Sequence, residues 1–358
     1  MIATNATPEV SVIVPARNEE ASLGACLQSL VGQCGERERP SSYPFPNEGK
    51  EWVTHSGYEI IVVDDHSTDR TREIAEGFAV RVIQADPLPA GWSGKCNACW
   101  SGAKVAQGKW LLFTDADTRH APDSIAQGLQ EAESTGAAML SYSPKQEVHS
   151  LAERALMPVI FAELATTFRP REVSDPKYPA AAAANGQYLL IRRGVYDIVG
   201  GHAAVAQAIL EDVELARLVK QAGYRLQFRL SDAVTTRMYR SFGAMWEGWT
   251  KNLALLFPSA RWLAAKRMLE FVLIVLTCAG VVVAVVDHDA LGIAINSGLA
   301  AALMGFYWRR IRRAHFDWPS NALAIFGLPV FAILLVNSYI SHEKGRVSWK
   351  GRVYQRPV

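Results

Sequence analysis

The chain has 358 residues, enough for one large domain or two. Its formal net charge is +2, and this near balance implies no nucleic acid or other strong polyanion as a partner. Hydrophobic residues make up 49% of the chain but are unevenly distributed. The sequence up to about Arg267 is typical of a soluble α/β protein, whereas the remainder contains three long apolar segments.

Apolar strand patterns alternate with helical patterns through the N-terminal half. Strands are expected over 10–14, 59–63, 80–84, 110–113 and 139–143, and helices over 21–31, 69–78, 96–107 and 123–133. This alternation predicts an α/β fold with a doubly wound, mostly parallel sheet. Segment 35–57 interrupts the order; it is rich in proline, serine and charge, and we expect an insertion loop there.

Polar side chains follow three of these strands, at the points where the strands end. They occupy residues 15–20, 64–69 and 115–117. The carboxyl ends of parallel strands meet at one edge of a sheet, so these groups are expected to surround a common ligand. Each also has a plain structural alternative, since Asp65 can cap the next helix and an Asp-x-Asp can be a solvated turn.

The third of these clusters points most directly to a ligand. Asp115 and Asp117 stand one residue apart after the apolar run 110–113. Two carboxylates in this position can hold a hard divalent cation, and the cation can hold a diphosphate. The pattern therefore favours a sugar-nucleotide site. No Gly-x-Gly-x-x-Gly follows the first strand, and segment 91–95 lacks the spacing of a phosphate loop, so two other nucleotide sites are disfavoured.

The sequence around these strand ends resembles family 2 glycosyltransferases, which have the nucleotide-diphospho-sugar transferase fold. The motifs are Val-Pro-Ala-Arg-Asn-Glu at 14–19, Val-Val-Asp-Asp-His-Ser-Thr-Asp at 62–69 and Asp-Ala-Asp at 115–117. The resemblance extends over roughly residues 9–256. Gly-Trp-Ser-Gly-Lys-Cys-Asn-Ala at 91–98 is similar to a membrane-bound branch that includes hopanoid-associated and carotenoid glycosyltransferases.

This resemblance implies roles for individual residues on the donor side. A nucleotide-diphosphate sugar would contact Pro15, Arg17, Glu19, Asp65, Lys95 and Asp115. Among these, Asp65 would bind the base, Lys95 would approach the base or the phosphates, and Asp115 would lie near the ribose. Asp117, with Asp115, would hold Mn²⁺ or Mg²⁺, which neutralises the leaving diphosphate.

The acceptor side needs a base that deprotonates a hydroxyl group. The family's acidic pair resembles Glu211-Asp212, so the resemblance implies Asp212 as the base and Glu211 as its support. The plain alternative is the acidic first turn of a helix, which the helix dipole favours. Asn185, Gly186 and His202 are expected to shape the acceptor side of the pocket.

The three apolar segments are 268–286, 291–308 and 323–340. Each is close to the ~20 residues that cross a hydrocarbon core, although three buried helices of a soluble domain are the alternative. The acidic link 287–289 lies between the first two segments, and four arginines follow the second within 309–313. The positive-inside rule then predicts a multi-pass protein of the inner or plasma membrane whose N-terminal domain lies in the cytoplasm.

The last segment is ambiguous. If it spans the membrane, the basic tail 341–358 lies outside, against the positive-inside rule. Pro329 is able to break the segment into a re-entrant hairpin that keeps the tail inside. The predicted organisation is a cytoplasmic glycosyltransferase domain over 1–256, an interfacial linker over 257–267, a transmembrane region over 268–340, and the tail.

These features together predict a membrane-anchored, inverting glycosyltransferase that acts on a membrane lipid, with a terpenoid lipid suggested by the resemblance. Processive synthases of the family carry Gln-x-x-Arg-Trp after the acidic pair, and Gln227-Phe228-Arg229-Leu230 does not match it. Transfer of a single sugar is therefore expected. Two alternatives stay open: a polyprenyl-phosphate sugar transferase, and a membrane scaffold that has lost activity. The intact acids Asp115, Asp117 and Asp212 argue against the scaffold.

Overall fold

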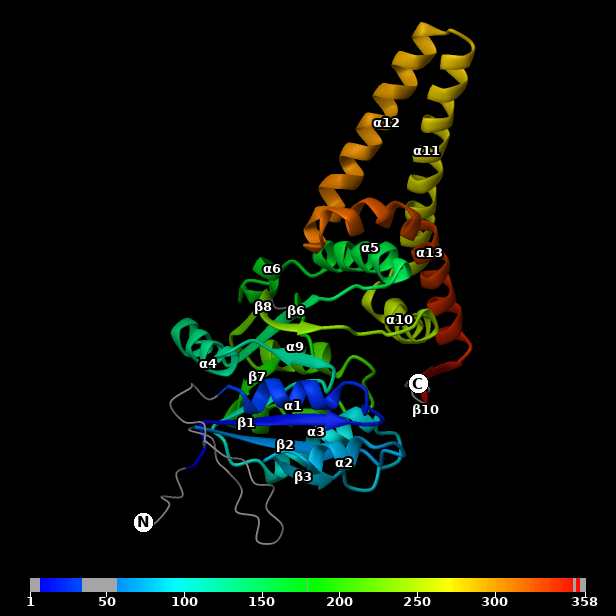
Figure 1. Ribbon diagram of the computed structural model, residues 1–358. Coiled ribbons are helices and arrows are strands. Elements are labelled where there is room, and N and C mark those ends of the chain that lie inside the picture. The colour runs from blue at the N-terminus through cyan, green and yellow to red at the C-terminus, as the bar shows by residue number, and fades with distance from the viewer. Residues whose placement is uncertain (1–6, 34–56, 179, 350–351, 355–358) are drawn as a thin grey trace. The chain divides into compact units, whose positions relative to one another are not determined.

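An eight-stranded sheet forms the centre of the part of the chain that ends at Thr236 (Figure 1). Its order is β3-β2-β1-β4-β7-β6-β8-β5. The strands are β1 Val10–Ala16, β2 Tyr58–Asp64, β3 Arg81–Gln84, β4 Trp110–Phe113, β5 Thr118–His120, β6 Met139–Gln146, β7 Leu189–Arg192 and β8 Leu226–Thr236. Neighbours from β3 to β4 pair in parallel, as do β6 and β8, whereas β7 and β5 are antiparallel to their neighbours. The predicted α/β fold with a mostly parallel sheet is confirmed.

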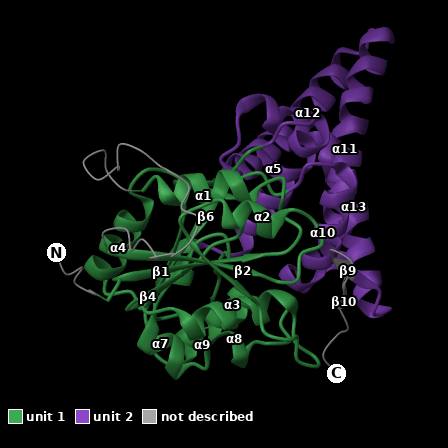
Figure 2. Cartoon of the chain, turned by 60° about the horizontal axis from the view of Figure 1, so that its bottom comes forward, with its two compact units in different colours: residues 1–147, 170–238 green, residues 148–169, 239–358 purple. Residues whose placement is uncertain are grey.

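The computed structural model describes residues 7–33, 57–178, 180–349 and 352–354. Apart from Gly57, the predicted insertion loop 35–57 lies outside these residues. The chain divides into two units, coloured separately in Figure 2. Unit 1 comprises residues 1–147 and 170–238, and unit 2 comprises 148–169 and 239–358.

Helices cover both faces of the sheet in unit 1. The helices are α1 Leu23–Val31, α2 Thr71–Glu76, α3 Gly94–Val105, α4 Ser124–Thr135, α6 Pro170–Ser174, α7 Arg193–Ile198, α8 Gly201–Ala204 and α9 Glu211–Gln221. Figure 2 shows α1 and α2 on one side of the sheet and α3, α7, α8 and α9 on the other.

The first strand shows why the parallel strands read as unbroken apolar runs. Successive side chains of a strand point to opposite faces. Val12 and Val14 belong to the core that also contains Leu27 of α1, and Ile13 lies on the face covered by α3. All three strand residues are fully buried. A strand covered on both faces has no solvent side, so apolar residues occupy every position.

Unit 2 contains three long apolar helices. Its elements are α5 Leu151–Thr167, α10 Phe242–Leu256, α11 Ala260–Val286, α12 Ala290–Ile311, the 3₁₀ turn η2 Arg312–Ala314, α13 Trp318–Glu343, β9 Val347–Trp349 and β10 Arg352–Tyr354. In the described chain, α11, α12 with η2, and α13 are each long and apolar enough to cross a membrane. The first of them begins at Ala260, within the segment 257–267 that we expected to be a linker.

The third apolar segment forms one helix. α13 continues through Pro329 and does not fold back as a hairpin, and Figure 1 shows the helix bent along its length. Proline removes one backbone hydrogen bond and commonly kinks a helix. Gly327 lies at the contact of α13 with α5, where a Cβ atom would stand only 1.9 Å from the carbonyl oxygen of Ala155. Glycine is therefore required for this close crossing.

A buried ion network connects α5, α11 and α12. Arg267 donates from Nε to Glu163 Oε1 at 2.8 Å and from Nη1 to Glu270 Oε2 at 2.8 Å. Arg310 Nη1 lies 2.8 Å from the same Glu270 oxygen and 3.3 Å from Glu163 Oε1. Two arginines and two glutamates balance, so the network has no net charge. Such a network fixes the geometry of the helices because removing one member leaves its partner buried and unpaired.

We expect Glu163→Gln to destabilise unit 2 by about 3–5 kcal/mol, because Arg267 and Arg310 would then share one carboxylate. The measurement is the thermal unfolding midpoint of the purified protein in detergent. Glu76→Gln is the control: Glu76 pairs with Arg72 at 2.9 Å on an exposed helix face, and its loss should cost less than about 1 kcal/mol. Equal midpoints for the two variants would contradict a structural role of the network.

Candidate functional site

The first two predicted clusters lie side by side. β1 and β2 are parallel and in register, with Pro15 opposite Val63 and Ala16 opposite Asp64. The chain therefore leaves both strands at the same edge of the sheet. Arg17 follows β1 and donates from Nη1 to the carbonyl oxygen of Asp65 at 2.7 Å. This bond connects the segment after β1 directly to the segment after β2.

Asn18 adds two further bonds between these segments. Its backbone has a φ of 52°, in the left-handed region that asparagine tolerates better than most residues. Its side-chain oxygen accepts from the backbone N–H of Thr68 at 2.9 Å, and its own N–H donates to Ser67 Oγ at 3.1 Å. The sequence interpretation did not single out Asn18. The pattern that could have identified this residue is an asparagine two residues after the end of a strand, in a turn-forming position.

Asp65 and Glu19 lie in different environments within these segments. Asp65 is buried, 4% exposed, and its Oδ1 lies 3.7 Å from Nδ1 of the exposed His66. Glu19 is half-buried; its N–H donates to Thr71 Oγ1 at 2.7 Å, and its carboxylate accepts from Ser22 Oγ at 2.7 Å. Hydroxyl groups of Thr71 and Ser22 thus hold Glu19, and the imidazole of His66 lies near Asp65. Both acids lie at the edge predicted for the nucleotide.

The Asp-x-Asp motif follows β4, which is the other neighbour of β1. Ala116 is buried, whereas Asp115 and Asp117 on either side of it are half-buried. The carbonyl oxygen of Asp115 accepts from Thr118 N–H at 3.1 Å, and that of Asp117 accepts from Thr236 Oγ1 at 3.3 Å. The backbone of the motif is therefore held from both sides, and all three predicted clusters meet at one sheet edge.

Lys95 joins the Asp-x-Asp motif to the predicted catalytic acids. Its Nζ lies 2.7 Å from Asp115 Oδ1 and 2.9 Å from Glu211 Oε1. Burial opposes the charge on Lys95, but the attraction of Asp115, Glu211 and Asp212 is stronger and raises its pKa well above the ordinary value. Lys95 therefore stays protonated. Its side chain as a whole remains 35% exposed.

Asp212 has the properties that a catalytic base needs. It lies in the first turn of α9, where its Oδ2 accepts from Gly186 N–H at 2.8 Å and its Oδ1 from Val213 N–H at 2.9 Å. Burial and the repulsion of Glu211 raise the pKa of Asp212 to about 6, while Lys95 and the two N–H groups limit the rise. At neutral pH the carboxylate is ionised, yet basic enough to accept a proton.

Gly186 brings the segment before β7 into this cluster. A Cβ atom at this position would stand 2.8 Å from Lys95 Nζ, 3.5 Å from Glu211 Oε1 and 3.7 Å from Asp212 Oδ2. The backbone thus approaches all three charged groups as closely as a residue without a side chain permits. This closeness allows its N–H to bind Asp212, and it explains why the position carries glycine.

The other two residues predicted for the acceptor side differ in exposure. Asn185 is half-buried; its N–H donates to Ser141 Oγ at 2.8 Å, next to Gly186. His202 is only 2% exposed, and its ring packs edge-on against Phe113 with centroids 4.5 Å apart. Its Nδ1 lies 3.0 Å from the hydroxyl of Tyr196, and burial lowers its pKa to about 4. His202 is therefore a neutral residue of the core beneath the site.

The carboxylates of the motif suit a cation that also binds a diphosphate. Among the described residues, no group of three His, Cys, Asp or Glu side chains is arranged to hold a metal ion by itself. Mg²⁺ in nucleotide sites is usually bound by one or two carboxylates together with substrate phosphates. Asp115 and Asp117 provide two half-buried carboxylates at the sheet edge, and this donor set fits such an ion.

The fold and the site together define a class of protein: an α/β protein with a polar nucleotide-type site at the carboxyl edge of its sheet. The family model for glycosyl transferase family 2 matches residues 11–197, just over half of the chain. The chain therefore belongs to glycosyl transferase family 2. The matched residues include the three predicted clusters, Lys95 and Gly186.

Several relatives have names that specify an activity. The chain is 30% identical over 262 residues to the 4,4'-diaponeurosporenoate glycosyltransferase of Staphylococcus haemolyticus (strain JCSC1435), covering 70% of this chain and 62% of that protein. It is 25% identical over 255 residues to the protein of the same name from Staphylococcus aureus (strain USA300), covering 68% and 60%. The match therefore spans about three fifths of the length of these curated relatives.

Among solved structures, the chain is similar to a mannosyltransferase from Pyrobaculum calidifontis in complex with GDP-Man and Mn²⁺. The two are 16% identical, the match covers 94% of this chain and 87% of that one, and the TM-score is 0.49.

We expect Lys95→Met to destabilise the protein most at high pH. Without the ammonium group the pKa of Asp212 rises further, so the folded state binds more protons than the unfolded state. Stability then falls as pH rises from about 4 through the raised pKa. At pH 8 the free energy of unfolding should fall by about 1–2 kcal/mol. This is less than for a fully buried ion pair, because the side chain of Lys95 is partly exposed. At pH 5 the loss should be smaller.

The measurement is the thermal unfolding midpoint at pH 5 and pH 8, with Lys104→Met as the matched control. Lys104 pairs with Asp86, and both side chains are about half exposed. The control should change stability by no more than about 0.5 kcal/mol at either pH. A Lys95→Met variant that loses the same stability at both pH values would contradict the coupling to Asp212.

Proposed function

We propose that this protein is a membrane-anchored, inverting glycosyltransferase that moves a single sugar from a nucleotide diphosphate to a membrane lipid. The observation that carries the proposal is the bridge from Asp115 through Lys95 to Glu211, with Asp212 beside it. Through this bridge, the proposed donor-binding motif and the proposed base, an aspartate with a raised pKa, would belong to one cluster. Transfer between a bound donor and an acceptor requires that proximity.

On the donor side, the segments after β1, β2 and β4 would bind the nucleotide sugar. The residues in question are Pro15, Arg17, Glu19, Asp65, Lys95 and Asp115. Arg17 and Asp65 are already connected by a hydrogen bond, which fixes the shape of this edge before the ligand arrives. Lys95 would offer its protonated ammonium group to the phosphates as a point charge.

Asp115 and Asp117 would hold Mn²⁺ or Mg²⁺ together with the diphosphate. When bound, the ion supplies positive charge to the leaving diphosphate, where negative charge develops.

On the acceptor side, Asp212 would act as the general base. The acceptor hydroxyl gives its proton to a carboxylate oxygen of Asp212 while its oxygen bonds to the anomeric carbon. The bond from that carbon to the diphosphate breaks on the opposite face, so the configuration at the carbon inverts. Glu211 supports this step by raising the pKa of Asp212, and Gly186 orients the carboxylate through its N–H.

The acceptor is proposed to be a membrane lipid, with the catalytic unit on the cytoplasmic face. Three helices able to cross a membrane support the location, and arginines at the end of α12 support the orientation. The named relatives act on diaponeurosporenoate, according to their names, which supports a terpenoid acceptor with a long apolar chain.

A screen of nucleotide sugars against a membrane lipid extract tests this function. The purified full-length chain is incubated with each donor, and the lipids are analysed by mass spectrometry. The expected result is a lipid heavier by one sugar residue. Modification only of a polyprenyl phosphate would favour the alternative acceptor, and the absence of both transfer and donor hydrolysis with every donor would overturn the proposal.

Asp212→Asn should lower the transfer rate by about 10²–10⁴-fold while nucleotide affinity stays near that of the unmodified chain, because the amide cannot accept the proton. The unmodified enzyme should become faster as pH rises through about 6, where Asp212 loses its proton, and then level off. Rates measured from pH 5 to pH 8 check both points.

The matched control for this variant is Glu214→Gln. Glu214 lies in the same helical turn but forms a partly exposed ion pair with Arg217. It should retain the rate and pH profile of the unmodified enzyme. An Asp212→Asn variant with an unchanged rate would remove Asp212 as the base.

Asp117→Asn should weaken metal-dependent binding of UDP or GDP by about tenfold or more, because one charged ligand of the ion is lost. Calorimetry with Mn²⁺, and again after EDTA treatment, measures this directly without turnover. Asp123→Asn is the control, since Asp123 is exposed and its left-handed backbone suits asparagine. Nucleotide binding that EDTA leaves unchanged would contradict the metal site.

A further inference from the structure

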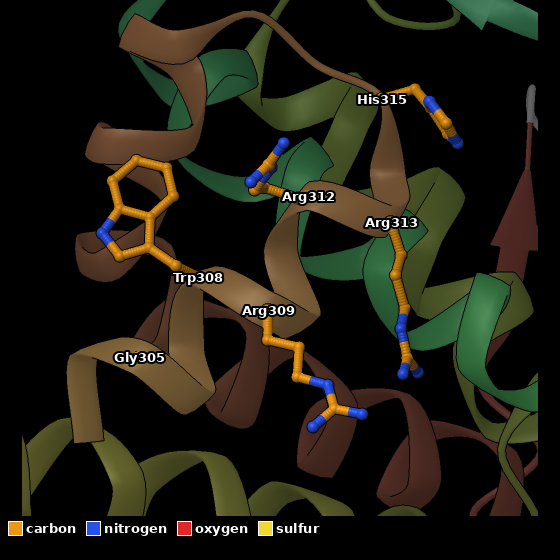
Figure 3. A pocket seen from close by; sticks show the side chains of 6 residues that line it. All are labelled: Gly305, Trp308, Arg309, Arg312, Arg313 and His315. Carbon is orange, nitrogen blue, oxygen red and sulfur yellow. The ribbon is translucent and has the colours of Figure 1, made fainter. Parts of the chain in front are cut away.

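A basic pocket lies at the end of α12, entirely within unit 2. It has a volume of about 620 Å³ and is lined by Gly305, Trp308, Arg309, Arg312, Arg313 and His315. Figure 3 shows the side chains of the other five residues projecting from the last turns of α12 and from the segment that follows it, with Gly305 on the helix backbone. None of these residues belongs to the proposed donor site, and none is the proposed base.

Among the described residues, no carboxylate pairs with the arginines of this pocket, whereas the neighbouring Arg310 has two such partners. Arg310 is in the same helical turn, and its charge is balanced by Glu163 and Glu270. Within the described ranges, no carboxylate forms an ion pair with Arg309 or Arg312. Arg313 has one weak contact, a donation to Thr166 Oγ1 at 3.4 Å. The pocket therefore carries three positive charges that the described protein does not neutralise.

The position of the pocket along the helix indicates what neutralises them. α12 has 22 residues, which gives it a length of about 33 Å, near the ~30 Å thickness of a hydrocarbon core. Only 6% of its apolar window is buried by protein. A helix of this kind crosses lipid, and its end then lies at the level of the headgroups. Trp308 fits that level, because tryptophan is enriched at membrane interfaces.

We propose that this pocket binds the headgroup phosphate of an anionic phospholipid. Guanidinium groups match phosphate oxygens through pairs of parallel N–H bonds, so arginine suits this ligand better than lysine does. Basic pockets at the membrane ends of helices are a recurrent form of lipid recognition. The inference goes beyond glycosyl transfer: it assigns a lipid site that is separate from the acceptor and needs no donor sugar.

Native mass spectrometry of the full-length chain in detergent tests the proposal. Delipidated protein is titrated with phosphatidylglycerol and with phosphatidylcholine of the same acyl chains. The unmodified chain should bind phosphatidylglycerol preferentially. The double variant Arg309→Gln and Arg312→Gln should bind it about 30-fold more weakly, since each substitution removes the charge-assisted hydrogen bonds of one guanidinium group to the phosphate. Replacing both residues by lysine should restore part of the affinity.

The matched control removes two positive charges from the same end of the α11–α12 hairpin. Arg261 and Lys266 are exposed near the start of α11, and neither lines the pocket. Arg261→Gln with Lys266→Gln should change the affinity less than about threefold. Equal weakening in both double variants would show only general surface charge and would overturn the site.

Two other outcomes would also overturn it. The first is the absence of any preference for phosphatidylglycerol over phosphatidylcholine in the unmodified chain. The second is binding of inorganic phosphate alone, with the same dependence on Arg309 and Arg312 and no gain from the lipid tails. No nucleotide sugar is present in these titrations, so the result is independent of whether the proposed transfer reaction occurs.

Discussion

The bridge made by Lys95 is the interaction on which the candidate site depends. One ammonium group contacts carboxylates from two distant parts of the chain, the end of β4 and the first turn of α9. Three acids this close together would repel each other and take up protons if the cation were absent. With Lys95 in place, Asp115 and Glu211 are held, and Asp212 keeps a pKa of about 6 rather than a higher one. In the proposed reaction, donor binding and proton transfer would therefore depend on the same positive charge.

Unit 2 uses arginine in two contrasting ways. In the network of Glu163, Arg267, Glu270 and Arg310 every charge has an opposite partner, and the result is a neutral connection between helices. On either side of Arg310 in the sequence, Arg309 and Arg312 line an open pocket. Paired charges stabilise the packing of helices, whereas charges at a helix end that have no carboxylate partner in the described protein attract a ligand. Neighbouring positions on one helix thus serve different purposes.

Much of the fold could be predicted because its main signals are local. β1, β2 and β4 are buried on both faces, and their apolar runs identify them without reference to the rest of the chain. β5 and β7 have only three and four residues, and much of β8 is polar and partly exposed, so no period marks them. These three strands were not predicted for this reason, whereas β6 was predicted over 139–143. The residues proposed for donor, metal and base remain predictions, although most of them meet at one edge.

The sequence by itself determined the order of the strands and helices around the site, the identity of its acids and the presence of three apolar segments. Each of these depends on residues close together along the chain. The tertiary structure decided that Lys95 binds Asp115 and Glu211 and that Gly186 touches the same cluster. It also decided that Arg310 pairs with Glu163 and Glu270, whereas no carboxylate of the described residues pairs with Arg309. Such pairings join residues 20 or more positions apart, as Lys95 and Asp115 are, and they follow from how the elements pack rather than from any local pattern.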